Sequence, residues 1–198
     1  MAEIWGIVLA AGASSRMKSQ KMILPFNGST VLESVLLNAG KALKDNLLTV
    51  LGSHLDNTVP LVTRAGVKYC INENYRDGML SSVICGFGNL PAAADAALII
   101  LGDQPQIKSG IIGKITEAWQ STRKGIIIPA FNGKRGHPVL IETRFREEIS
   151  RLDPGKGLKS LISGNQDEVF EVECGTSDIL RDLDTYEEYM HEINLLSH

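Results

Sequence analysis

The hydrophobic positions of this 198-residue chain form short apolar runs separated by longer amphipathic stretches. The run at residues 4–9 is rich in β-branched side chains and does not alternate with polar ones. This pattern is typical of a strand that is covered on both faces, as in a parallel sheet. Further strands are predicted at residues 47–51, 67–71, 96–101 and 126–129.

Between these runs, apolar residues recur at helical spacing and follow recognisable capping signals. Thr30-x-x-Glu33 predicts a capping box, and Asp56 is a candidate N-cap for a second helix that ends near Gly66. Further helices are predicted at residues 79–87 and 109–122. Strands that alternate with helices in this way predict an α/β fold with a parallel sheet and helices on both of its faces.

The last third of the chain has a less regular pattern. Strands are predicted at residues 138–142 and 169–172, and helices at 144–152 and 158–162. Asp184, with Glu187 three residues later, is a good N-cap for a final helix. Since no linker, repeat or low-complexity segment interrupts the pattern, residues 1–198 are expected to form one domain.

Composition narrows the classes of function. A formal charge of −3 and a charged content of 22%, without a block of like charges, argue against electrostatic binding to nucleic acid or membranes. No run approaches the roughly 18 apolar residues of a membrane span, and the apolar N-terminus lacks the basic start of a signal peptide. The three separated cysteines, Cys70, Cys85 and Cys174, favour reduced thiols in a cytoplasmic protein over a disulfide or zinc framework.

The segment after the first strand is the first candidate site. Residues 10–15 have small side chains, so their backbone N–H groups can approach an anion closely, and the cations of Arg16 and Lys21 follow. An ordinary turn with surface cations remains the alternative for this segment alone.

A carboxylate follows the most continuous apolar strand. Asp103 comes two residues after the strand at 96–101, and ligands in open α/β sheets bind beyond the carboxyl ends of the strands. There the carboxylate could hold Mg²⁺ against a nucleotide, although a turn or helix-cap aspartate is the alternative. The predicted helix at 79–87 adds exposed N–H groups and the hydroxyls of Ser81 and Ser82 at its first turn.

Several motifs in order carry a family resemblance. They are Leu9-Ala10-Ala11-Gly12-x-Ser14-x-Arg16-Met17, then Lys21, Leu101-Gly102-Asp103-Gln104-Pro105, Gly136-His137-Pro138-Val139 and Asp182-Leu183-Asp184-Thr185. The chain resembles the MobA-like nucleotidyltransferases over nearly its whole length, and most closely their molybdenum cofactor cytidylyltransferase branch. Gly-x-Gly-x-x-Gly is absent after the first strand, which disfavours a dinucleotide-binding oxidoreductase.

The resemblance implies a Rossmann-like three-layer α/β/α sandwich and Mg²⁺-dependent transfer of CMP from CTP to the terminal phosphate of the pterin cofactor. Arg16, Lys21 and Asp103 would be catalytic, Asp103 and Asp184 would bind the metal, and Gly136, His137 and Pro138 would face the pterin. The residues implied to bind the nucleotide are Leu9, Ala10, Ala11, Gly12, Ala13, Ser14, Arg16, Lys21, Gly78, Ser81 and Ser82.

Some features leave alternatives open. Ala10-Ala11 resembles the cytidylyl branch, whereas the guanylyl branch tends to have two glycines there. The chain departs from the family at Lys18, where glycine is usual, and at Lys159, where arginine is usual. Other nucleotidyl transfers of the same kind remain open, as does an accessory role in which the protein hands cofactor to a molybdenum hydroxylase with little catalysis.

Overall fold

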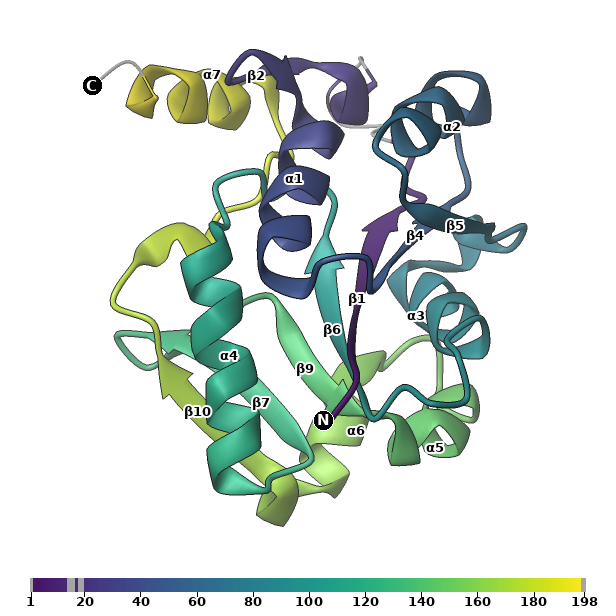
Figure 1. Cartoon of the computed structure of the whole chain (residues 1–198), viewed down its shortest axis with the longest axis vertical. Coiled ribbons are helices and arrows are strands. Elements are labelled where there is room, and N and C mark those ends of the chain that lie inside the picture. Colours follow the sequence, from purple (N-terminus) through teal and green to yellow (C-terminus); the bar gives the residue numbers. More distant parts are fainter. Residues whose placement is uncertain (1, 14–16, 18–19, 197–198) are drawn as a thin grey trace.

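A computed structural model describes residues 2–13, 17 and 20–196 (Figure 1). Within them a central sheet of eight strands has the order β10-β7-β9-β6-β1-β4-β5, with β8 paired to β7. Its strands are β1 (Ile4–Ala10), β4 (Leu47–Leu51), β5 (Lys68–Ile71), β6 (Ala96–Leu101), β7 (Ile126–Phe131), β8 (Lys134–Arg135), β9 (Val139–Glu142) and β10 (Val169–Glu173). A small hairpin is formed by β2 (Pro25–Phe26) and β3 (Ser29–Thr30).

Most of the sheet is parallel, as predicted. β1 lies at its centre and pairs in parallel with β4 and β6. β9 is antiparallel to both β6 and β7, so β7 and β10 again run with β1. The carboxyl ends of β1, β6, β7 and β10 therefore share one edge of the sheet, which is the edge where ligands are expected.

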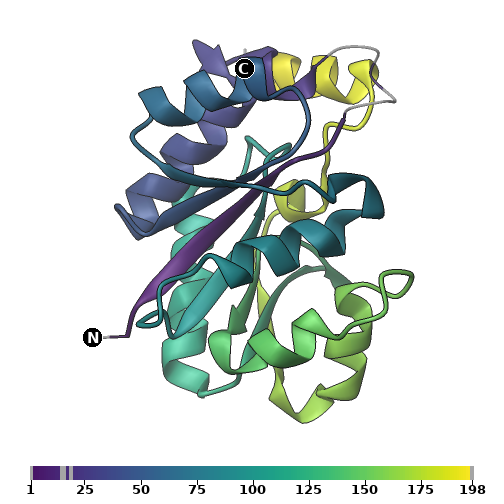
Figure 2. The same cartoon turned by 90° about the vertical axis from the view of Figure 1, so that its right-hand side faces the viewer.

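Helices cover both faces, which confirms the predicted three-layer sandwich (Figure 2). One face carries α1 (Val31–Leu43), α2 (Leu55–Arg64) and α4 (Ser109–Thr122), and the other carries α3 (Met79–Gly88), α5 (Arg146–Ser150) and α6 (Leu158–Gly164). The last helix, α7 (Tyr186–Leu195), lies beside β2 at the top of Figure 1.

The position of strand β1 explains why the apolar run at residues 4–9 does not alternate with polar residues. Val8 and Ala10 pack into the core under α1 and α4, while Ile7 and Leu9 pack into the core under α3. All seven residues of β1 are buried. A strand between two helical layers has no solvent face, so each of its side chains contributes to one of the two cores.

The helix starts test the capping predictions. Thr30 and Glu33 form the predicted capping box of α1, in which the Glu33 N–H donates to Thr30 Oγ1 over 3.3 Å. α2 begins after His54 instead of at Asp56. The predicted cap at Asp184 is wrong, because Thr185 is the N-cap of α7 and forms its capping box with Glu188.

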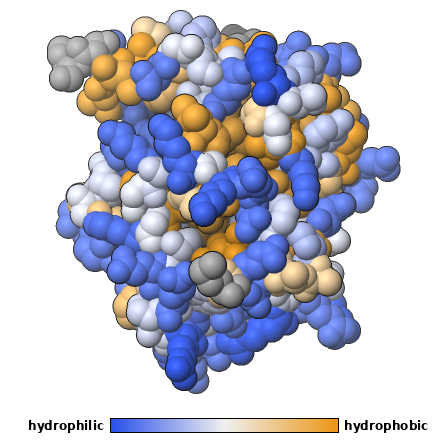
Figure 3. Space-filling model, in the orientation of Figure 1, coloured by the Kyte–Doolittle hydropathy of each residue, from blue (hydrophilic) through white to orange (hydrophobic). Residues whose placement is uncertain are grey.

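The described helices include none with the length and apolar character needed to cross a lipid bilayer. On the face seen in Figure 3, hydrophilic residues are interspersed with hydrophobic ones, and one hydrophobic patch is at the upper left, where α7 lies. The exposed large apolar side chains of that helix and the residue after it are Tyr186, Met190, Leu195 and Leu196.

Candidate active site

A cleft of about 380 Å³ lies at the carboxyl ends of β1 and β6. One wall comes from the segment after β1, one from the start of α3, and the floor from residues that follow β6 and precede α7. The described residues that line it are Leu9, Ala11, Gly12, Ala13, Lys21, Met22, Tyr75, Gly78, Met79, Ser82, Leu101, Asp103, Asp182 and Asp184.

Lys21 lies between two of the carboxylates in this cleft. Its Nζ donates to Asp103 Oδ2 over 2.7 Å and to Asp184 Oδ1 over 3.1 Å. Its side chain is only 7% exposed, whereas those of Asp103 and Asp184 are 20% and 30% exposed. The two aspartates lie 81 positions apart in the chain, yet both reach one buried cation.

The backbone explains how the two aspartates meet. Gly102 follows β6, and its N–H donates to Leu9 O over 2.9 Å. A Cβ at Gly102 would lie 2.7 Å from Leu9 O, so the close approach of these chains requires glycine there. The Leu183 N–H then donates to Asp103 O over 3.3 Å, which fixes the neighbouring Asp184 beside Asp103.

Asp182 adds a third carboxylate to which sequence reasoning assigned no role. Gln104 Nε2 donates to its Oδ1 over 2.9 Å. Burial raises the pKa of Asp182 above its ordinary value, and the charges of Asp103 and Asp184 raise it further. Its position two residues before Asp184 was the signal, since alternate residues of an extended segment share a side.

The arrangement suits a divalent cation that is shared with a substrate. Among the described residues no group of three or more histidine, cysteine, aspartate or glutamate side chains forms a metal cluster. Asp103 and Asp184 nevertheless direct carboxylate oxygens at one cation position, which Lys21 Nζ takes. Mg²⁺ is commonly held by one or two carboxylates together with substrate phosphates, so these residues fit it.

The small-residue segment after β1 is anchored from one side. The Ser53 N–H donates to Ala11 O over 3.0 Å, and its Oγ donates to Gly12 O over 2.6 Å. Leu9, Ala11, Gly12 and Ala13 line the cleft, whereas Ala10 does not. Ser14 and Arg16, like the divergent Lys18, lie outside the described residues, so their roles remain predictions.

The start of α3 forms the opposite wall. Gly78 has a φ of +97°, a conformation that favours glycine, and it leads into Met79 and the buried Ser82. Asn72 Nδ2 donates to Ser82 Oγ over 3.0 Å and to Ser81 Oγ over 2.8 Å. Ser81 lines a separate cavity instead of the cleft, and its role with the nucleotide remains a prediction.

The Gly136-His137-Pro138 segment does not line the cleft. A Cβ at Gly136 would lie 2.2 Å from Ile179 O, and the His137 N–H donates to the same oxygen over 3.0 Å. Burial lowers the pKa of His137, and the negative charge of Asp103 opposes this shift. The segment is thus held close to Asp103 against the 3₁₀ turn η5 (Ser177–Leu180), which sequence reasoning missed.

Residues 6–169 match the family model of the MobA-like NTP transferase domain. The chain belongs to this family. The match includes most of β1, the cleft segment after it, Asp103 and the Gly136–Pro138 segment, and so confirms the resemblance that the motifs indicated.

Two molybdenum cofactor enzymes are similar to this chain over most of their own length. The molybdenum cofactor cytidylyltransferase of Escherichia coli (strain K12) is 28% identical over 194 residues, which cover 96% of this chain and 95% of that protein. The probable molybdenum cofactor guanylyltransferase of Bacillus cereus (strain Q1) is also 28% identical, over 74% of this chain and 72% of its own.

Among solved structures, Rv0371c from Mycobacterium tuberculosis H37Rv in complex with manganese is 25% identical and superimposes with a TM-score of 0.80. The superposition covers 98% of this chain and 99% of that one. A divalent metal therefore occurs in a similar protein of the same fold.

Proposed function

We propose that this protein is a Mg²⁺-dependent cytidylyltransferase that transfers CMP from CTP to the terminal phosphate of molybdenum cofactor and releases pyrophosphate. The observation that carries the proposal is the meeting of Lys21, Asp103 and Asp184 beside the small-residue segment after β1. Similarity to the Escherichia coli cytidylyltransferase over 96% of the chain supports the choice of reaction.

In this reaction a phosphate oxygen of the acceptor attacks the α-phosphorus of CTP, and the bond from that phosphorus to the oxygen bridging to the β-phosphate breaks. Pyrophosphate leaves with the bonding electron pair. The protein mainly has to position the two phosphates in line and neutralise the charge that spreads over their oxygens. A protein nucleophile is not required.

The triphosphate would lie along the segment of Ala11, Gly12 and Ala13, where small side chains leave the backbone accessible. Lys21 supplies a cation at the floor of the cleft, and Arg16 would add a second. Both charges act on the phosphate oxygens and on the leaving pyrophosphate, where charge develops during the transfer.

Asp103 and Asp184 would hold Mg²⁺, and a metal ion held there would withdraw charge from the phosphate oxygens. Asp103 is the better placed of the two, because β6 and the Gly102 contact fix its backbone. Asp182 would stay close by without a direct role in holding the metal, since its Oδ1 is engaged by Gln104.

The cytidine would lie toward the start of α3, near Gly78 and Ser82. Ala11 lines the cleft and would contribute to the choice of base, as the resemblance to the cytidylyl branch implies. A Cβ at the adjacent Gly52 would lie 2.9 Å from Ala11 Cβ and 2.7 Å from Tyr75 Cβ, so little room remains on that side. The pterin acceptor would approach from the Gly136, His137 and Pro138 side.

A guanylyltransferase is the second candidate, because the Bacillus cereus relative has the same identity over a shorter part of the chain. The third is an accessory protein that binds the cofactor and passes it to a molybdenum hydroxylase.

One experiment separates these candidates: the protein is incubated with molybdenum cofactor, Mg²⁺ and each nucleoside triphosphate in turn, and pyrophosphate release is measured. The proposal predicts the fastest release with CTP and none after chelation of the metal. Fastest release with GTP would refute the cytidylyl assignment. Tight cofactor binding without release from any nucleotide would favour the accessory role.

A further inference from the structure

Two cysteines that lie far apart in sequence are in contact in the fold. Cys70 is on β5 and Cys85 is on α3, and their Sγ atoms lie 3.5 Å apart. A disulfide bond is about 2.05 Å long, so the two sulfur atoms need to approach by only about 1.5 Å. Both cysteines are partly exposed, whereas Cys174 is buried and directs its Sγ to Val172 O.

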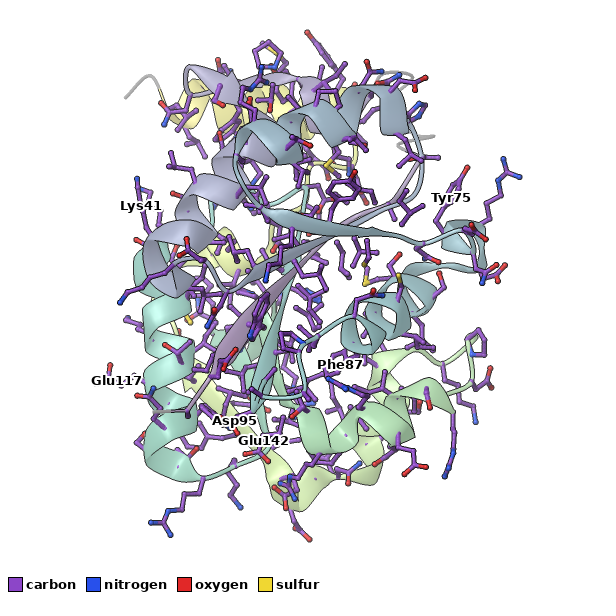
Figure 4. All side chains as sticks on the ribbon, turned by 45° about the vertical axis from the view of Figure 1, so that its right-hand side comes forward. Lys41, Tyr75, Phe87, Asp95, Glu117 and Glu142 are labelled. Atoms are coloured by element: carbon purple, nitrogen blue, oxygen red, sulfur yellow. The ribbon has the colours of Figure 1, made fainter. Side chains whose placement is uncertain are left out.

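Cys70 and Cys85 flank the segment that forms one wall of the cleft. The chain from Cys70 to Cys85 leaves the sheet, turns through η2 (Tyr75–Asp77) and enters α3. Tyr75, Gly78, Met79 and Ser82, which form one wall of the cleft, all lie within it. Figure 4 shows Tyr75 on this connection between β5 and α3, with Phe87 further along the helix. A bond between the two sulfur atoms would close this segment into a loop.

The two thiols differ in access. Cys85 lines a cavity of about 470 Å³ on the other side of the start of α3 from the cleft, together with Asn74, Asp77 and Ser81. Cys70 does not line that cavity. Burial and contact with Cys85 raise the pKa of Cys70 to about 12, so its thiol stays protonated at neutral pH. An oxidant in the cavity therefore meets Cys85 first.

We propose that Cys70 and Cys85 form a reversible thiol–disulfide site that ties the wall of the cleft to the sheet. With a disulfide compound such as oxidised glutathione, the Cys85 thiolate attacks one sulfur, and one glutathione leaves and takes up a proton. Cys70 then loses its proton and attacks Cys85 Sγ, and the second glutathione leaves. Two protein thiols are oxidised, and one glutathione disulfide is reduced to two thiols.

The test incubates the folded protein with oxidised glutathione, denatures it, alkylates the remaining thiols and measures the mass of the chain and of its peptides. The expected product has one alkylated cysteine, Cys174, and a linked peptide pair containing Cys70 and Cys85. Reduction restores three alkylated cysteines. The Cys174→Ser variant should form the same link at an unchanged rate.

Two single variants test the order of reaction. Cys70→Ser should stop at a glutathione adduct on Cys85, and Cys85→Ser should carry at least tenfold less adduct on Cys70. Amide hydrogen exchange of residues 71–84 should slow in the oxidised wild-type chain. Three alkylatable cysteines after incubation, a stable adduct without an internal link, or unchanged exchange in a linked protein would each overturn the proposal. None of these readouts depends on nucleotidyl transfer.

Discussion

The carboxylates at the two edges of the central sheet have different surroundings. At the amino edge, where the parallel strands begin, Asp95 and Glu142, the last residue of the antiparallel β9, lie together in the lower half of Figure 4. Asp95 Oδ2 accepts from the Glu3 N–H over 2.7 Å, and Glu142 Oε1 accepts from Trp119 Nε1 over 3.0 Å. Arg144 pairs with both Glu142 and Glu168. Each of these carboxylates already has a donor within the protein.

At the carboxyl edge, three carboxylates face one lysine among the described residues of the cleft. Lys21 bonds two of them, and Gln104 bonds the third. Burial raises the pKa of Asp182, and the negative charges of Asp103 and Asp184 raise it further, whereas at the amino edge Arg144 lowers the pKa of Glu168. Side chains of opposite charge therefore pair with one another at the amino edge, whereas negative charge is in excess at the carboxyl edge, where we propose that Mg²⁺ and the triphosphate bind.

The largest expected effect is on catalysis. Asp103→Asn should reduce turnover roughly 100-fold, because a charge-assisted contact contributes up to about 3 kcal/mol and each 1.36 kcal/mol is a factor of ten. Asp95→Asn, the matched change at the amino edge, should leave turnover within twofold. Pyrophosphate release under saturating Mg²⁺ measures both. The contrast between the edges fails if Asp103→Asn keeps more than a tenth of wild-type activity.

The second effect concerns Lys21. Lys21→Met should reduce turnover about tenfold to 100-fold and the free energy of unfolding by about 1–3 kcal/mol, because it removes the cation that bonds both Asp103 and Asp184. Arg144→Met, at the more exposed amino edge, should cost less than about 1 kcal/mol and spare turnover. Thermal denaturation should also show that Mg²⁺ stabilises Lys21→Met more than wild type. Equal Mg²⁺ stabilisation of the two proteins would contradict the shared cation position.

The third effect is on stability, for one glycine at each edge of the sheet. Gly136→Ala should lower the free energy of unfolding by about 1–3 kcal/mol, because its Cβ meets the rigid backbone oxygen of Ile179. At Gly125 the nearest atoms are the tip of Arg144, at 2.5 Å, and the Phe145 ring. Since the arginine can move, Gly125→Ala should cost less. Urea denaturation of both variants measures the two losses in free energy of unfolding. A larger loss for Gly125→Ala than for Gly136→Ala would contradict the prediction.

The smallest effect is a pH dependence. The pKa of His137 is lowered from 6.5 by burial, so the unfolded chain binds a proton more readily than the folded one. The stability that neutral His137 contributes is present above pH 6.5 and is lost as the pH falls below it. His137→Gln should therefore show a shallower loss of melting temperature between pH 7 and pH 5. If wild type and His137→Gln lose the same melting temperature between pH 7 and pH 5, His137 is not the cause of the pH dependence.

Much of the fold was predictable because the apolar runs are continuous. The strands at 47–51 and 96–101 and the helix at 109–122 agree with the structure at both ends. The final helix was less predictable, because Asp184-x-x-Glu187 and Thr185-x-x-Glu188 are adjacent and equivalent capping signals. A long-range contact decides between them: the Asp184 carboxylate reaches Lys21, and Thr185 takes the cap.

The candidate site was predictable in its parts but less so in its arrangement. Asp103 and Lys21 could be paired because both follow or lie near the carboxyl ends of buried strands. Asp182 could have been assigned only from its position two residues before Asp184. Tyr75 could not be assigned, since its position depends on how distant segments pack. The same holds for Cys70 and Cys85, whose contact arises because α3 packs beside β5.

The most direct test is a crystal structure of the protein with Mn²⁺ and a non-hydrolysable CTP analogue, in which anomalous scattering locates the metal. We predict one metal peak within coordination distance of Asp103 and of the analogue's phosphate oxygens, with Lys21 Nζ also beside the phosphates. A metal bound away from Asp103, or an analogue bound outside the cleft of Ala11, Lys21 and Asp103, would contradict the account.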